Sequence, residues 1–108
     1  MGLSLKQRVE FHRKRSFDYE GNRKDRFFSI GYLAGKNLFD ERIWSDEQRR
    51  SVIKDKVSNV KKLSSSKSLS QAELEELSRS KGLISYASDL SQEKQKKGLS
   101  LFNKKVRK

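Results

Sequence analysis

The most apolar part of the chain, residues 24–39 (KDRFFSIGYLAGKNLF), constrains the fold most, because so polar a chain has few other segments from which to build a core. Its apolar residues recur at the spacing of a helix, so that a stripe forms along one face. The members of this stripe are Phe27, Ile30, Ala34 and Leu38. The segment is therefore predicted to be a helix within the core.

Two glycines lie inside this predicted helix. Gly31 and Gly35 are four residues apart, so they share one side of the helix and permit the close approach of a neighbouring backbone. Each glycine in a helix interior costs roughly 1 kcal/mol relative to alanine, which indicates that something packs tightly there. Core packing within the chain is one interpretation. The other is a docking groove for a partner helix, including helical self-association through the Gly31/Gly35 face.

Composition indicates a thin core and a polyanionic partner. Only 32% of the 108 residues are hydrophobic, and the net charge is +12. A chain of this length forms one small domain. The surplus of positive charge opposes compaction and favours binding to a polyanion. A soluble, merely basic protein is the alternative.

Every clear period in the sequence is helical, and no proline is present to interrupt a helix. We therefore expect an all-α fold of four to five short helices that form a small bundle, with a basic N-terminal arm and a basic C-terminal tail. The expected parts are the N-terminal arm, with its own helix, at residues 1–23, a helical core at 24–63, a Ser-rich linker at 64–70 and a helical C-terminal region at 71–108.

Capping signals mark where the helices begin. The expected helices are residues 4–16, 24–39, 45–63 and the region after Ser70. Ser4, Ser45 and Ser70 are the expected N-caps of the first, third and last of these. Gln48 and Glu73 complete capping boxes with Ser45 and Ser70, respectively. Gly82 weakens the middle of the C-terminal region and could bend or split it, and Asp89 or Ser91 could restart a helix. A turn at residues 18–22 contains Gly21 and Asn22, which tolerate positive φ.

The residues that usually carry chemistry are scarce. The chain contains no cysteine, which excludes a disulfide framework and a thiolate metal site, and His12 is the only histidine. No phosphate-binding loop and no metal-ligand cluster is visible. We therefore expect no enzymatic activity, no cofactor and no metal. No apolar run approaches eighteen residues and no signal-peptide core is present, so we expect a cytoplasmic protein outside the membrane.

Binding through cationic side chains remains as the expected function. Lysine and arginine neutralise phosphates and release counterions, and exposed aromatic rings stack on unpaired bases. The candidate contacts in the N-terminal part are Arg13, Lys14, Arg15, Arg23, Lys24 and Arg26, and those in the tail are Lys94, Lys96, Lys97, Lys104 and Lys105. Aromatic residues interleave with the first group: Phe11, Phe17, Tyr19, Phe27 and Phe28. The sequence thus predicts a non-enzymatic protein that binds DNA, RNA or a ribonucleoprotein.

Three short stretches resemble known families. The segment FHRKRSFDYEGNRKDRFF resembles the basic N-terminal arm of anti-CRISPR proteins that block Cas9, which implies that Arg13, Lys14 and Arg15 contact a Cas9–guide RNA complex. RFFSIGYLAGKN is similar to a pattern of small phage and mobile-element proteins. Residues 80–102 resemble the helical thumb of retron-type reverse transcriptases, which implies a helix pair that grips nucleic acid. The alternative function is therefore inhibition of a host defence nuclease.

Overall fold

A computed structural model of the chain describes the backbone of residues 3–106 and the side chains of residues 3–95. Within that backbone there are four helices and no strand. The helices are α1 (Leu5–Ser16), α2 (Arg23–Asp40), α3 (Asp46–Ser64) and α4 (Gln71–Val106). The all-α prediction is confirmed, with four helices.

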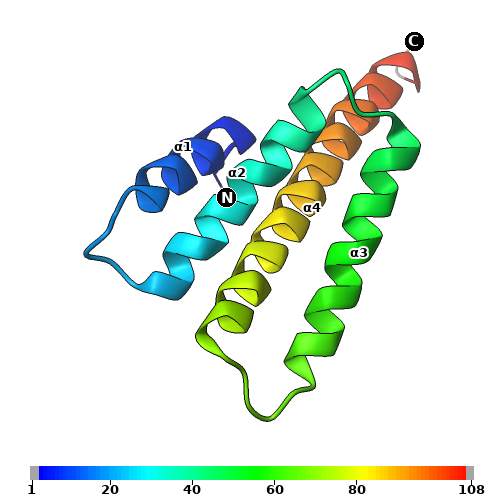
Figure 1. Cartoon of the computed structure of the whole chain (residues 1–108). Coiled ribbons are helices and arrows are strands. Elements are labelled where there is room, and N and C mark those ends of the chain that lie inside the picture. Colours follow the sequence, from blue (N-terminus) through cyan, green and yellow to red (C-terminus); the bar gives the residue numbers. More distant parts are fainter. Residues whose placement is uncertain (1–2, 107–108) are drawn as a thin grey trace.

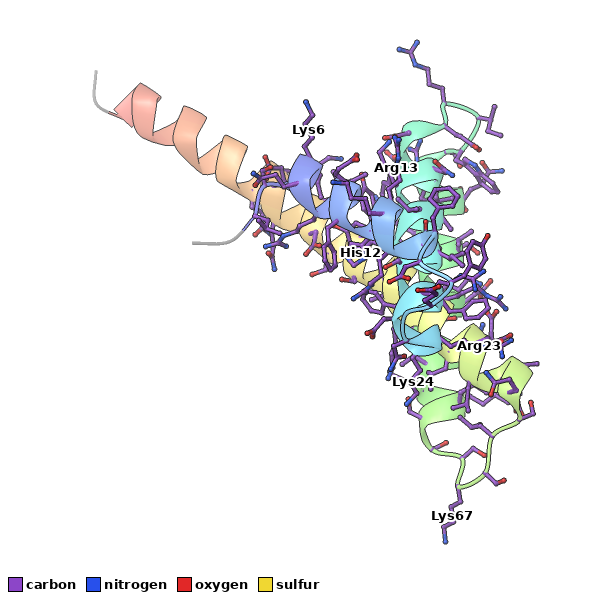
Figure 2. All side chains as sticks on the ribbon, turned by 90° about the vertical axis from the view of Figure 1, so that its left-hand side faces the viewer. Lys6, His12, Arg13, Arg23, Lys24 and Lys67 are labelled. Carbon is purple, nitrogen blue, oxygen red and sulfur yellow. The ribbon has the colours of Figure 1, made fainter. Side chains whose placement is uncertain are left out.

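The helices lie side by side in the order α1, α2, α4, α3 (Figure 1). α2 packs against α4 in the middle, α1 packs mainly on α2, and α3 packs on α4. The expectation that all helices are short is wrong for α4, which runs unbroken for 36 residues. Its C-terminal end extends beyond the other three helices (Figure 2), so the molecule measures 58 × 31 × 28 Å.

Two glycines bring α2 and α4 into direct backbone contact. A Cβ atom added at Gly31 would overlap the carbonyl oxygen of Arg79 and lie 2.6 Å from its carbonyl carbon. A Cβ atom added at Gly82 would overlap the carbonyl oxygen of Phe28 and lie 2.7 Å from the amide nitrogen of Tyr32. Each helix therefore presents a glycine where the other presents a carbonyl group. This reciprocal contact fixes the closest point between the two central helices.

The same contact decides between the two interpretations of the Gly31/Gly35 face. Gly31 and Gly35 are buried, and their neighbours are residues of α4 in the same chain. The face is thus core packing, and the expectation of a groove free for a partner helix or a second copy is not met. The expectation that Gly82 bends or splits its helix is also wrong, because its missing side chain makes room for α2 while α4 stays continuous.

The buried apolar core is as thin as the composition predicts. Among the described side chains it consists of Tyr32, Leu38, Leu83 and Tyr86, which come from α2 and α4 alone. Two of these four are tyrosines, which add large apolar area but need a partner for the hydroxyl group. Tyr32 meets that need by donating a 2.8 Å hydrogen bond from Oη to Asp89 Oδ2.

The local start signals are confirmed. The side chains of Ser4 and Ser45 accept hydrogen bonds from the backbone amide of the third residue of α1 and α3, respectively. In each case that third residue is a glutamine, whose side chain accepts a hydrogen bond from the backbone amide of the serine. Ser70 does the same with Glu73 at the start of α4. The predicted Ser-rich linker is the loop that joins α3 to α4. In the predicted turn, Asn22 is the N-cap of α2, and neither it nor Gly21 uses positive φ.

Candidate nucleic-acid interface

The end of α1, the loop after it and the start of α2 form an exposed surface rich in cations and aromatic rings. We call the residues Arg13, Lys14, Phe17, Tyr19 and Lys24 the hairpin tip. All five are exposed, and the residues Phe17 and Tyr19 keep 69% and 73% of their surface accessible. Figure 2 shows Arg13 and Lys24 on the side of the molecule where α1 covers α2. Along the chain, exposed cations thus precede and follow two mostly exposed rings.

Arg15, although adjacent to Lys14, is part of the packing between α1 and α2. Its Nε donates a 2.7 Å hydrogen bond to Oγ of the fully buried Ser29. Its guanidinium carbon lies 5.1 Å from the centroid of the Phe11 ring and 5.8 Å from that of Phe28. The prediction that Arg15 contacts a partner therefore conflicts with its place in the structure, where its donor and its charge already have partners.

Arg23 and Arg26 are also engaged within the fold. Arg23 Nη2 lies 2.8 Å from Oε1 of Glu75 and so ties the start of α2 to α4, although 65% of its side chain is exposed. The guanidinium carbon of Arg26 lies 3.9 Å from the centroid of the Tyr19 ring. This cation–π contact holds the loop ring against α2. Of the six cations predicted in the N-terminal part, Arg13, Lys14 and Lys24 are those left in the hairpin tip.

A polar cluster beneath the hairpin tip fixes α1 on α2 and α4. The imidazole of His12 stacks on the ring of Tyr32, with 4.0 Å between centroids, and its Nδ1 lies 2.9 Å from Ser29 Oγ. Arg8 Nη1 donates a 2.8 Å hydrogen bond to Asp89 Oδ1, while the other carboxylate oxygen accepts from Tyr32. These contacts substitute for apolar burial, because no residue of α1 is fully buried.

The protonation state of His12 belongs to this cluster. Burial lowers the pKa of His12, the guanidinium of Arg15 lowers it further, and the carboxylate of Asp89 opposes both. Because Ser29 Oγ accepts from Arg15 Nε, its own hydrogen is available to Nδ1 of the neutral imidazole. A protonated His12 would direct a second donor at the same oxygen. The cluster therefore favours the neutral ring and serves to position α1.

The structure does not bring the predicted tail together with the hairpin tip. Lys94 is exposed and lines a cleft between α3 and α4, where Arg50 is another lining cation. The side chains of Lys96, Lys97, Lys104 and Lys105 lie outside the described residues. The C-terminal end of α4 and the loop between α1 and α2 lie far apart in both views (Figures 1 and 2).

The predicted contact residues divide in the structure into exposed ones and packed ones, a division that the sequence does not reveal. Phe17 and Tyr19 were grouped with Phe27 and Phe28, which are partly buried, because spacing alone does not separate exposed rings from packed ones. Ser29 was not identified as the partner of Arg15. A fully buried serine on the face of α2 that meets α1 is the signal, and it becomes visible only once the two helices are docked.

The described residues contain neither a candidate metal centre nor a membrane-spanning helix. Among them, no group of three or more histidine, cysteine, aspartate or glutamate residues is arranged to hold a metal ion. Within the same part of the chain, no helix combines the length and the apolar character needed to cross a membrane. Comparison of the chain with protein-family models, with curated proteins and with solved structures found no significant match.

Proposed function

We propose that the chain is a non-enzymatic accessory protein, of the kind that phages and mobile elements encode, which binds nucleic acid through the hairpin tip. The observation that carries this proposal is the pair of exposed rings, Phe17 and Tyr19, between three exposed cations. Exposed cations suit phosphates, and the ring of Phe17 and the face of Tyr19 that Arg26 leaves open suit unpaired bases. The ligand class that fits best is therefore a single strand or a loop, in DNA, in RNA or in a ribonucleoprotein.

Salt dependence tests the cationic half of the proposal. Binding of a labelled single strand and of a duplex is measured between 50 and 300 mM salt for the intact chain and for the variant Arg13→Ala/Lys14→Ala/Lys24→Ala. The slope of log K against log salt should fall by roughly 2 to 3 in the variant, since each phosphate contact contributes about 0.7 to 0.9.

A matched control variant loses the same number of positive charges on another helix, α3. Lys54, Lys61 and Lys62 are exposed on α3, and changing all three to alanine also removes three positive charges. This control should keep most of the slope. Equal loss in both variants would mean diffuse attraction to a cationic molecule, and no binding by the intact chain at 50 mM salt would refute the proposal.

The aromatic half has its own readout. Phe17→Ala and Tyr19→Ala should each weaken binding to the single strand by about 1 to 3 kcal/mol and leave the salt slope nearly unchanged, because stacking releases no counterions. Both side chains are exposed, so neither change removes a core contact, although Tyr19→Ala also removes the cation–π contact with Arg26. Unchanged affinity for the single strand would show that the rings do not stack on bases.

The alternative function, inhibition of a host defence nuclease such as a Cas9–guide RNA complex, is supported by one feature of the same surface. Phe17 lines an apolar groove next to the hairpin tip, and such a groove is suited to a protein surface. An inhibitor should bind the ribonucleoprotein far more tightly than the naked guide RNA. Equal affinity for the two would leave plain nucleic-acid binding as the function.

A further inference from the structure

A groove of about 760 Å³ runs between α1 and α2, above Tyr86 of α4. Its lining divides into two kinds of side chain. The apolar ones are Leu5, Val9, Phe17, Leu33 and Tyr86, and the polar ones are Lys6, Glu10, Arg13, Lys36 and Asn37. Neither the thin core nor the proposed nucleic-acid interface uses the groove as a whole, so it calls for a role of its own.

α1 is a sparsely covered helix. None of its residues is fully buried, and its hold on α2 and α4 comes largely from polar contacts such as those of Arg8 and Arg15. Leu5 and Val9, one turn apart, are only half-buried along the groove, and Phe17 at its end is mostly exposed. A helix pair with this much apolar surface left open has room for a third element to pack against it.

The charges at the rim of the groove are predominantly positive. Lys6 and Arg13 are exposed, whereas Lys36 forms an ion pair with Asp40 one turn further along α2. Glu10 is the one acidic residue of the lining. A partner that complements this rim carries acidic residues beside its apolar side chains.

We propose that the groove docks an acidic amphipathic helix of a partner protein. The α1 side of the lining contains residues 5, 9, 13 and 17, a row at four-residue spacing that forms a ridge for a packed helix. Twelve residue steps at 1.5 Å each give the groove a length of about 18 Å, which matches about three helical turns. The partner helix places its apolar side chains against Leu5, Val9 and Leu33.

Charge excludes the most obvious occupant from the chain itself. A second copy would have to offer an amphipathic helical segment, and the C-terminal part of α4 has the apolar residues Leu99, Phe102 and Val106. That part is rich in lysine, and a cationic segment would be repelled by the cationic rim. The inference goes beyond the proposed nucleic-acid binding and does not rest on it. The groove shares Arg13 and Phe17 with the hairpin tip, but Lys6, Val9 and Leu33 lie outside the tip.

The test is a fluorescence-polarisation titration of the full chain with a designed probe. The probe is a labelled, capped 14-residue peptide with leucine on one helical face and glutamate on the other. A second peptide has the same composition with the leucines scattered, so that no apolar face forms. The protein variants are Lys6→Glu at the rim and Lys54→Glu on α3, which are both exposed positions and both change the charge by the same amount.

Saturable binding of the amphipathic peptide, weakened about fivefold or more by Lys6→Glu and unchanged by Lys54→Glu, is the expected result. Backbone amide signals of Leu33 and Asn37 should shift in the NMR spectrum on addition of this peptide. The proposal is overturned if the peptide does not bind, if both variants weaken it equally, or if the scattered peptide binds as well. It is also overturned if laurate, a twelve-carbon carboxylate, shifts the Leu33 signal while the peptide does not.

Discussion

Replacing Gly82 with alanine should separate the two central helices. The added Cβ atom would overlap the carbonyl oxygen of Phe28 and lie 2.9 Å from its carbonyl carbon and 2.7 Å from the amide nitrogen of Tyr32. All three atoms belong to the backbone of α2, so no side-chain rotation relieves the clash. α2 and α4 must move apart by about 1.5 Å before this methyl group reaches ordinary contact distance.

The cost of that movement follows from the core that it opens. The four buried apolar residues Tyr32, Leu38, Leu83 and Tyr86 come from these two helices. Each contributes roughly 2 kcal/mol, so the shared core is worth about 8 kcal/mol. A gap of 0.5 to 1 Å forfeits about a quarter to a half of the contact energy, so a gap of about 1.5 Å forfeits at least half of it, or about 4 kcal/mol or more. Alanine regains about 1 kcal/mol of helix propensity, which leaves a net loss of about 3 kcal/mol or more.

The measurement is urea unfolding followed by circular dichroism at 222 nm. Gly21→Ala is the matched control, because the added Cβ there meets the carboxylate of Asp18, the mobile end of an exposed side chain. Gly21 has no positive φ, so this control should be neutral or stabilise by up to about 1 kcal/mol. Gly31→Ala should resemble Gly82→Ala, since its Cβ meets the backbone of Arg79. If Gly82→Ala is as stable as the parent chain, the reciprocal glycine contact does not exist as described.

Two further predictions concern the cluster that holds α1. Burial and the guanidinium of Arg15 lower the pKa of His12, so the unfolded chain binds more protons than the folded chain below about pH 6.5. The free energy of unfolding should therefore fall as pH falls through this region. The urea midpoints at pH 5.0 and 7.5 should differ less in His12→Gln than in the parent chain, and an unchanged difference would contradict the lowered pKa of His12. Arg15→Ala should lower the free energy of unfolding by about 1 to 2 kcal/mol, since it removes a charged hydrogen bond to buried Ser29, whereas the neighbouring Lys14→Ala should change it by less than about 0.5 kcal/mol; equal effects would show that Arg15 is as free as Lys14.

The features that local sequence determines were predictable, and those that depend on docking were not. The capping boxes of Ser45 and Ser70 involve residues three positions apart, so their bonds follow from the local sequence. The role of Gly82 depends on the carbonyl of Phe28, which lies on another helix. Local propensity alone predicts that this glycine weakens the helix, whereas the pairing of α4 with α2 leaves no room for a larger residue at this position.

The division of the predicted contact residues has the same origin. Lys14 and Arg15 are adjacent cations, and the sequence treats them alike. Successive residues on a helix point about 100° apart, so only one of the two can face α2. Which one does so depends on how α1 docks, and in the structure it is Arg15 that reaches Ser29. A candidate binding surface read from charge alone therefore includes residues whose charge already serves the fold.

The positions of the acidic residues determine which cations are paired within the fold and which remain available to a ligand. The ion pairs between helices, Arg8–Asp89, Arg23–Glu75 and Lys56–Glu76, occupy acidic residues of α4. For Glu76, burial alone would raise the pKa, but hydrogen bonds from Arg79 and Lys56 outweigh it and hold the pKa below the usual value, so its charge is committed to the fold.

The cations of the hairpin tip, in contrast, take no part in these ion pairs between helices. These cations come from α1 and α2, and mutual repulsion at the tip acts on α1, a helix that has no fully buried residue. A polyanion bound there would relieve that repulsion and add a contact made only in the folded state. By mass action such a ligand stabilises the fold, by about 2.7 kcal/mol at one hundred times its dissociation constant. Binding and the anchoring of α1 are therefore coupled, so a ligand of the tip should protect the amides of α1 from hydrogen exchange.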